Sequence, residues 1–397
     1  MTKKNYHLTA LSLYINYIVH GIGVVIISQN KAALGVQWNT DAQGVMTVVS
    51  MLGIGRLIAI VFSGYLSDKF GRKPFVLLGM VSYILYFVGL LYAPNTTVAA
   101  ILTVIAGIAN SFLDSGTYPA LMEAYPKNAG TATVLIKAAV QIGQWILPFI
   151  ILLATAVGQY QLSFYIAALA LLLNALLVWR TPFPDQDAKE AEAAGEKKEE
   201  SVSVFKSQPK MWLEGVAFVL YGFISQATFY TISQFISAYG QSVAGMDEGA
   251  ASLLLSTYST GTLVCVAFTA LVGIKIRPVN LVLPYTFMSM ISIAVMYLFP
   301  SPTVMQIGAA LVGFFAAGGV MQLGLTVMGE MFPAGKGTIT SIFYTFGSIA
   351  SFAIPFFGGR MSLQNVMLMD TVFAVIGFVI AVIVFIRYYQ TIDTTKK

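Results

Sequence analysis

Charged residues are scarce in this sequence. Asp, Glu, Lys and Arg make up only 10% of its 397 residues, whereas soluble domains average about 25%. Hydrophobic residues account for 57%, so the chain has too few charged side chains to cover its apolar surface in water. The composition therefore excludes a soluble globular protein.

Cysteine is almost absent, and the motifs of nucleotide or metal chemistry are missing. Cys265 is the single cysteine and lies inside an apolar stretch, so the chain forms no disulfide within itself and a small core residue is expected. The sequence contains no glycine-rich nucleotide loop, no metal-ligating cluster and no appended domain. These absences count against ATP-driven transport and against a sensor or membrane enzyme, and they predict no cofactor and no metal.

Long apolar segments make up most of the sequence. Each is near the ~20 residues that cross ~30 Å of hydrocarbon as a helix, and none shows the ~10-residue alternation of barrel strands. The sequence predicts an all-α membrane protein, embedded in the lipid bilayer through twelve transmembrane helices. The predicted spans are residues 8–28, 42–66, 74–92, 97–123, 131–155, 161–180, 211–237, 249–272, 279–299, 303–330, 336–358 and 363–389.

Positive charge sets the predicted orientation, because Lys and Arg concentrate in cytoplasmic loops. With the N-terminus inside, nearly all Lys and Arg outside the apolar runs are cytoplasmic, and only Lys31 and Arg360 lie on the other side. Both termini are then cytoplasmic, and the net charge of +5 reflects topology rather than binding to nucleic acid. We expect a multi-pass protein of a bacterial plasma membrane that acts as a monomer.

A polar interval divides the spans into two related sets of six. The segment from Glu123 to Thr133 recurs 207 residues later, from Glu330 to Thr340, with its Glu, Pro, Gly and two Thr in the same places. The sequence therefore predicts two pseudo-symmetric six-helix bundles joined by a charged cytoplasmic linker. The predicted parts are an N-terminal bundle at 1–183, a linker at 184–209 and a C-terminal bundle at 210–397.

The loop between the second and third spans carries the most specific motif. From Gly64 to Lys73 it reads Gly-x-Leu-x-Asp-x-x-Gly-Arg-Lys, a polar turn in which five or six residues are expected to reverse the chain. Its glycines, Gly64 and Gly71, permit close backbone approach or a positive φ. At every specified position the motif resembles the signature loop of the major facilitator superfamily, a family of membrane transporters. The resemblance implies two halves related as parallel repeats, with a substrate site between them near the midplane.

The resemblance also implies charge pairs that close the cytoplasmic side in the outward-open state. Arg72 is expected to meet Glu123, and Asp68 to cap the neighbouring helix end. By the internal repeat, Glu330 is expected to face Lys275 or Arg277 of the loop at 273–278. The alternative is that these are ordinary interfacial charges, each of which contributes little.

Four charged or titratable residues lie deep in the predicted spans, all in the first half: His20, Arg56, Asp114 and Lys137. A charge within hydrocarbon costs at least ~2.5 kcal/mol, so such residues usually face a cavity and have a partner. From the rise of ~1.5 Å per residue, Asp114 and Lys137 come within pairing reach. Asp114, or His20 with its ordinary pKa of ~6.5, is expected to carry a proton. The alternatives are a purely structural ion pair, a bracing role for Arg56 and a packed histidine.

Polar residues recur at helical spacing along several spans. In members of the family, helices 1, 4, 7 and 10 line the cavity with 2, 5, 8 and 11 beside them, and the polar stripes fall on these helices. Any single glutamine can instead hold two helices together. The residues expected to contact substrate are Asn16, Arg56, Asn110, Lys137, Gln141, Gln144, Gln226, Tyr230 and Gln322.

Two transport functions are compatible with this pattern. The favoured hypothesis is proton-coupled uptake of a small polar solute by alternating access, and Arg56 with Lys137 indicates that this solute carries a carboxylate. The alternative is a proton-coupled multidrug efflux antiporter. Relatives of that class carry a Gly-Pro motif on helix 5, whereas Pro148 here follows Leu147 and lacks the glycines after it. This departure counts against efflux.

Overall fold

The computed structural model describes residues 6–125, 128–184, 205, 207–272, 276–318, 320–332 and 336–392. Within these ranges the regular secondary structure is helical, apart from an isolated bridge between Phe205 and Ile392, which agrees with the predicted all-α class. The chain divides into two compact units, Met1–Lys198 and Glu199–Lys397. Most of the linker predicted between the bundles, residues 185–204, lies outside the described residues.

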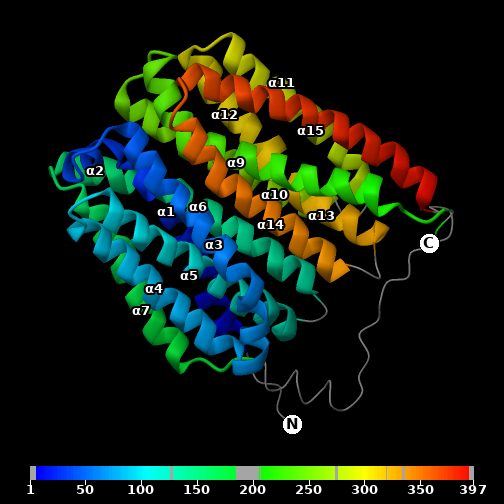
Figure 1. Ribbon diagram of the computed structural model, residues 1–397, viewed down its shortest axis with the longest axis horizontal. Coiled ribbons are helices and arrows are strands. Elements are labelled where there is room, and N and C mark those ends of the chain that lie inside the picture. The colour runs from blue at the N-terminus through cyan, green and yellow to red at the C-terminus, as the bar shows by residue number, and fades with distance from the viewer. Residues whose placement is uncertain are drawn as a thin grey trace. The chain divides into compact units, whose positions relative to one another are not determined.

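The first unit consists of helices that follow one another through short turns (Figure 1). Six of its helices are long and apolar enough to cross a membrane. The short helix α2 occupies the first predicted external loop and was not predicted. The helices are α1 (His7–Gln29), α2 (Lys31–Gln37), α3 (Ala42–Phe70), α4 (Arg72–Tyr92), α5 (Thr96–Ala124), α6 (Ala129–Ala156) and α7 (Gln161–Arg180).

The second unit contains four helices that are long and apolar enough to cross a membrane, and shorter apolar helices at 302–317 and 342–358 match two further predicted spans. Its elements are η2 (Met211–Gly215), α9 (Val216–Ser242), α10 (Glu248–Val272), α11 (Pro278–Leu298), α12 (Pro302–Val312), η3 (Gly313–Ala317), α13 (Val320–Met331), α14 (Lys336–Gly358) and α15 (Leu363–Thr391).

The tenth predicted span, 303–330, is not one continuous α-helix. It divides into α12, the π-helical turn η3 and α13. The irregular turn begins at Gly313, whose carbonyl oxygen accepts a hydrogen bond of 3.1 Å from the Thr262 hydroxyl of α10. Single π turns inside α-helices are frequent at functional sites.

The turn between α3 and α4 is tighter than predicted. Helix α3 continues through Asp68 to Phe70, and α4 begins at Arg72, so Gly71 alone joins them. Gly71 has φ 99°, a conformation that side chains with a Cβ disfavour. Gly64, by contrast, is helical, and a Cβ atom added to it would meet nothing within 4 Å.

Helices α3 and α5 touch through their backbones. A Cβ atom on Gly55 of α3 would lie 2.0 Å from the Val104 carbonyl oxygen, and one on Gly107 of α5 would lie 2.2 Å from that of Leu52. Only glycine fits at either position without a shift of the backbone. This contact fixes the part of α3 that continues into Arg56.

The second unit repeats this contact 206 residues further along the chain. A Cβ atom on Gly261 of α10 would lie 2.1 Å from the Ala310 carbonyl oxygen, and one on Gly313 would lie 2.0 Å from that of Tyr258. In both units the two glycines of a pair lie on different helices. The Cβ position of each glycine is nearest to the carbonyl oxygen of the residue three positions before the other glycine. The internal repeat found in the sequence is therefore also present in the helix packing.

We expect Gly55→Ala to lower the unfolding midpoint of the protein, because its Cβ atom would collide with backbone that cannot move aside. Overpacking of this kind costs about 1–3 kcal/mol. Gly64→Ala, in the same helix but facing open space, is the matched control, and should be neutral or stabilise by about 0.5–1 kcal/mol. Tryptophan fluorescence during heating in detergent measures both; equal midpoints would show that the α3–α5 contact is loose.

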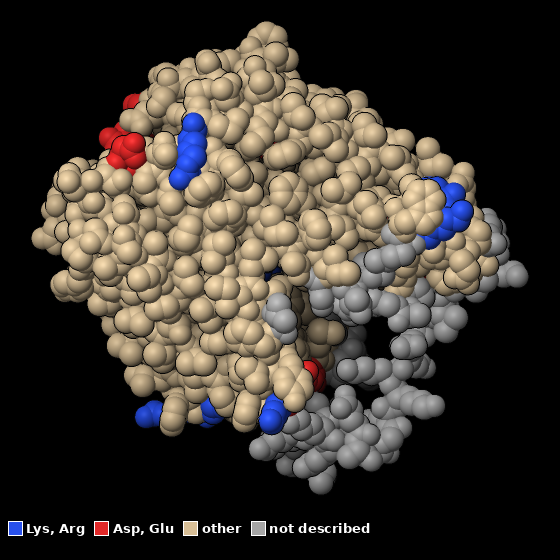
Figure 2. Space-filling view, viewed as in Figure 1, with Lys and Arg blue, Asp and Glu red and all other residues tan. Residues whose placement is uncertain are grey.

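Charged side chains occupy little of the surface between the helix ends. On the face shown in Figure 2 they form a few small groups near the edges, with a broad uncharged surface between them. Many large apolar side chains are exposed on the described helices, among them Leu169, Leu173 and Val379. Such a surface is stable in lipid and not in water.

Candidate functional site

Asp114 of α5 lies at the centre of a polar network in the first unit. Its Oδ2 atom is 3.2 Å from Nη2 of Arg56 on α3. Its Oδ1 atom accepts a hydrogen bond of 2.5 Å from the Tyr17 hydroxyl of α1. Three helices therefore converge on one carboxylate, and both of its oxygens are bound. An ion pair within a membrane span marks a functional site by default.

The contact between α3 and α5 brings Arg56 to Asp114. Arg56 follows Gly55, whose backbone lies against α5, and its carbonyl oxygen accepts a hydrogen bond of 3.2 Å from the Ser111 hydroxyl. Asp114 stands one turn beyond Ser111, within reach of the guanidinium. Lys137, the partner expected from the sequence, is half-buried on α6, and its pairing with Asp114 stays a prediction.

The side chain of His20 contacts α4, whereas that of Asp114 contacts α1 and α3. Its Nδ1 atom lies 2.7 Å from the Tyr83 hydroxyl of α4, and its ring packs edge-on against Tyr17 with centroids 5.5 Å apart. Tyr17, which the sequence analysis did not identify, therefore contacts both of the proposed proton carriers. The signal that could have found it is its position three residues before His20, on the same face of the helix.

Buried amides lie on helices α1, α5 and α6 of the same unit. Gln141 and Gln144 of α6 are fully buried, and the described residues offer neither the oxygen nor the nitrogen of either amide a hydrogen-bond partner. The same holds for Nδ2 of Asn110 on α5. Asn16 points to α7, where its Oδ1 accepts a 2.5 Å bond from Asn174. Unsatisfied buried amides need an explanation, and a bound polar ligand or water supplies one.

The predicted substrate residues of the second unit lie on α9 and α13. Gln226 is half-buried and lies against Gly347 of α14. Tyr230 is buried, with its ring 5.2 Å from that of Phe229. Gln322 belongs to α13, but its side chain lies outside the described part of the structure.

Asp370 corrects the expectation that all deep ionisable residues belong to the first half. It lies in α15, is 0% exposed, and accepts a hydrogen bond of 2.8 Å from the Thr228 hydroxyl of α9. The sequence analysis missed it because the twelfth helix does not line the cavity in the family. A search for every acid inside an apolar run would have found it, since Asp370 is the single acidic residue of the predicted span 363–389.

Arg72 joins two carboxylates at one end of the first unit. It forms an ion pair with Asp68 four residues earlier, and its Nη2 atom lies 3.2 Å from Oε1 of Glu123 near the end of α5. Asp68 was expected to cap a helix end, but it accepts from Arg72, and the start of α4 has no side-chain cap among the described residues. Lys73 donates a 2.6 Å bond to the Trp179 carbonyl oxygen of α7. The turn thus ties together α3, α4, α5 and α7.

Glu330, the counterpart of Glu123 in the repeat, accepts a hydrogen bond from the Tyr388 hydroxyl of α15. Arg277 is close enough to interact electrostatically with the same tyrosine. Residues 273–275 of the facing loop, including Lys275, lie outside the described residues. A pair between Glu330 and a cation of this loop therefore stays a prediction.

Known proteins resemble this chain along most of its length. Residues 13–303 match the family described as Major Facilitator Superfamily. The inner membrane transport protein YdiM of Escherichia coli is 45% identical over 97% of this chain and 95% of its own length. A gentisate transporter of Corynebacterium glutamicum is 22% identical over 66% of this chain and 60% of its own. The solved xylose transporter XylE of Escherichia coli shares the fold, with TM-score 0.78 and 14% identity over 98% of this chain and 97% of that one.

Proposed function

Because this chain belongs to the major facilitator superfamily of membrane transporters, we propose that it moves a small organic anion into the cell together with a proton. Family membership makes it a transporter and not an enzyme. The observation that carries the finer proposal is the Asp114 carboxylate held by Arg56 and Tyr17 inside the membrane-spanning helices. One site there holds both a protonatable group and a cation.

Competition for Arg56 couples the two solutes. While Asp114 is ionised, its charge satisfies Arg56, and an incoming anion would have to displace it. Once Asp114 is protonated the guanidinium needs a new anion, and the carboxylate of the solute supplies it. Proton and anion then each raise the affinity for the other by the same factor, as linkage requires. The Tyr17 hydroxyl holds the Asp114 side chain in position through this exchange.

Neighbouring groups favour a polar, hydroxylated acid as the solute. The amides of Gln141 and Gln144 are buried and unsatisfied among the described residues, and hydrogen bonds to the hydroxyls of a solute would remove a cost of about 1–3 kcal/mol per group. Lys137 stands one turn before Gln141 and adds a second positive charge. Gentisate, the solute named for a relative, is itself a hydroxylated carboxylate.

The proposed setting is the cytoplasmic membrane, with both termini inside. Two considerations support it. The distribution of Lys and Arg follows the positive-inside rule, and YdiM is named as an inner membrane protein. Import driven by a proton gradient across that membrane then needs no cofactor other than the proton.

Uptake into proteoliposomes tests the proposal. The purified full-length protein is offered hydroxylated organic acids, sugars and cationic dyes in turn, with and without a proton gradient directed inward. We expect one or more of the acids to accumulate, and only when the gradient is present. Accumulation of dyes when the proton gradient is reversed to point outward would instead establish an efflux antiporter, and uptake of sugars alone would contradict an anionic substrate.

The contacts of Arg72 form the proposed cytoplasmic gate. Arg72 is largely buried and reaches Asp68 and Glu123 at once, so opening this end of the unit has to break charge pairs. We infer that these pairs form only in the closed arrangement, so that they favour states in which the cytoplasmic side is shut. Glu330 is proposed to play the corresponding part in the second unit.

Glu123→Gln should shift the population toward states that are open to the cytoplasm. Loss of a pair that contributes about 1 kcal/mol changes such an equilibrium roughly fivefold. Labelling of single cysteines introduced along the cytoplasmic half of α5, in a Cys265→Ser background, measures the change as a faster reaction. Glu248→Gln, which removes an exposed carboxylate of α10, is the control. Equal labelling rates in both variants would leave Glu123 as a surface charge.

A further inference from the structure

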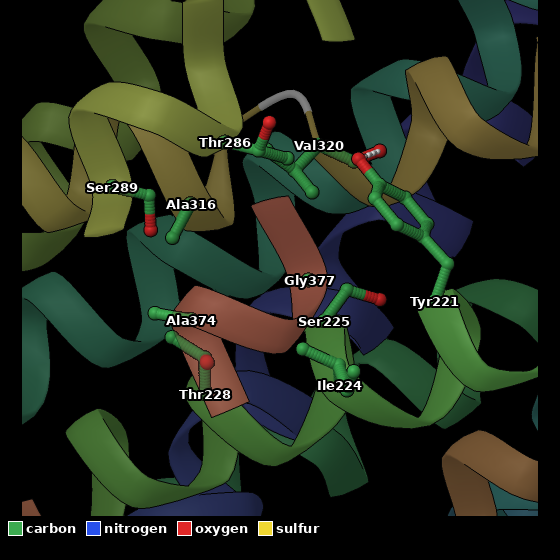
Figure 3. Close-up of a pocket in the computed structure, with 10 residues that line it drawn as sticks. All are labelled: Tyr221, Ile224, Ser225, Thr228, Thr286, Ser289, Ala316, Val320, Ala374 and Gly377. Carbon is green, nitrogen blue, oxygen red and sulfur yellow. Dashed lines mark hydrogen bonds between the residues drawn. The ribbon is translucent and has the colours of Figure 1, made fainter. Parts of the chain in front are cut away.

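A small cavity lies within the second unit and is lined by none of the residues of the Asp114 network. Its volume is about 30 Å³, and about 10–15 Å³ is enough for a water molecule. Figure 3 shows hydroxyl groups from α9 and α11 around it, with the α15 ribbon that carries Ala374 and Gly377 in the middle of the view. The polar side chains that line it are Tyr221, Ser225, Thr228, Thr286 and Ser289.

Most of these hydroxyls already donate their protons to the protein. Tyr221 donates to the Val320 carbonyl oxygen at 3.2 Å, the dashed line in Figure 3, and Ser225 donates to the Gly222 carbonyl oxygen at 3.1 Å. Thr286 donates to backbone carbonyls of its own helix. These groups can therefore offer only lone pairs to the contents of the cavity. Such a lining favours a guest that donates protons.

Thr228 connects this cavity to Asp370. Its hydroxyl lies beside Ala374 in Figure 3 and donates to Oδ1 of Asp370, one turn earlier on α15, at 2.8 Å. The second carboxylate oxygen, Oδ2, is buried and has no hydrogen-bond partner among the described residues. A fully buried carboxylate that is half satisfied is costly when it is ionised.

The groups that face Asp370 supply no compensating charge. None of the ion pairs formed by the described side chains includes it. From α10, Tyr258 interacts with it electrostatically, and the Tyr258 hydroxyl is also buried without a partner in the described ranges. On α11, the titratable Tyr285 instead bonds Thr269 at 3.0 Å. Within the described ranges, the polar groups recorded against Asp370 are thus the hydroxyls of Thr228 and Tyr258.

We propose that Asp370 is a second proton-binding site, which exchanges its proton with water in the adjoining cavity through the Thr228 hydroxyl. A protonated water gives a proton to the Thr228 oxygen while the Thr228 hydroxyl proton passes to Oδ1 of Asp370. The step leaves a neutral water, an intact hydroxyl and a neutral carboxylic acid. The site belongs to the second unit, is separate from the proton assigned to Asp114, and requires only that the chain be a transporter.

A proton fits this site better than a metal cation. Hard cations such as Ca²⁺ and Mg²⁺ take six or more oxygen ligands. Among the described residues Oδ2 of Asp370 and the Tyr258 hydroxyl have no hydrogen-bond partner, and Oδ1 already accepts from Thr228, so the recorded contacts do not amount to such a ligand set. A proton needs a single oxygen, and the Oδ1–H group that the relay creates can donate a hydrogen bond back to the Thr228 oxygen.

Infrared spectroscopy of the full-length protein in lipid, without any transport substrate, tests the site. Absorption of protonated carboxyl groups is followed as the pH is raised, and each variant is subtracted from the wild type so that unaffected carboxyls cancel. We expect Asp370→Asn to remove one titrating component and Asp114→Asn a different one. If only Asp114→Asn removes a titrating component, the result supports the proposed function and overturns this inference. If only Asp370→Asn removes one, the result supports this inference and contradicts the proton site at Asp114.

If Asp370→Asn fails to fold, two variants of Thr228 and a change of the salt in the buffer still test the site. Thr228→Val removes the hydrogen bond that stabilises the ionised carboxylate, so the Asp370 component should shift along the pH axis. Thr228→Ser keeps the hydroxyl and should leave the component in place. An unshifted component in Thr228→Val would contradict the role of Thr228. A component that moves when sodium chloride replaces choline chloride would show a metal cation competing at the site, and would overturn the proton-only assignment.

Discussion

Asp114→Asn is expected to abolish accumulation of substrate driven by a proton gradient, while exchange of internal for external substrate stays measurable. Asparagine has nearly the same shape as aspartate, but it cannot take up or release a proton. It resembles the protonated carboxyl, so Arg56 stays available to the anion and the loaded site can still change its access. Coupling is lost because the proton no longer decides when the anion binds.

Two assays on one preparation separate coupling from folding. Counterflow of labelled against unlabelled substrate reports exchange, and uptake under an inward proton gradient reports coupling. Tyr17→Phe is the matched variant, since it removes the hydroxyl that bonds Asp114 but keeps the ring beside His20; it should alter the pH profile and retain accumulation. If Asp114→Asn still concentrates substrate with an unchanged pH profile, Asp114 does not carry the proton, and His20 becomes the candidate.

Arg56→Gln is expected to weaken binding of the anion roughly ten- to a hundredfold, with little effect on an uncharged analogue. A hydrogen bond to a charged group contributes about 1.5–3 kcal/mol, and each ~1.4 kcal/mol is a factor of ten in affinity. The variant also leaves Asp114 without its cation, so the carboxyl stays protonated and the affinity for the anion should lose its dependence on pH.

Calorimetry with the transported acid and its primary amide measures this difference. Arg56→Lys keeps the charge but not the planar donor geometry, and should fall between wild type and Arg56→Gln. Lys137→Gln is expected to act in the same direction as Arg56→Gln, since it also removes positive charge near the buried amides. Equal losses for the acid and the amide in Arg56→Gln would mean that Arg56 braces α3 against α5 and does not bind the solute.

The sequence was sufficient to predict the helical membrane fold, because apolar runs of spanning length follow directly from composition. The Arg72–Glu123 contact was also predictable, since the motif and the internal repeat bring the second loop to the end of the fourth span. The break at Gly313 was not, because it depends on the π turn at that point of the tenth span. A hydropathy pattern does not predict such local changes in backbone hydrogen bonding.

The partner of Asp114 was harder to predict than its depth. Counting residues along a helix gives the depth of a side chain in the membrane. Arg56 and Lys137 both lie deep in their predicted spans, so depth alone does not select the partner of Asp114. The backbone contact of Gly55 with α5 brings Arg56 to Asp114, because it sets how α3 is rotated and how closely it approaches. Asp370 was missed for a related reason: the importance of a helix was judged from the family rather than from its own residues.

The most direct test of anion–proton symport is the proton balance of binding itself. The purified protein, in weakly buffered solution, is mixed with the acid that the uptake experiments identify, and the pH change is recorded against a matched addition to Asp114→Asn. Symport through Asp114 predicts that wild-type protein takes up protons from solution as the anion binds and that Asp114→Asn takes up none. Release of protons on binding, or an equal response from both proteins, would contradict the account.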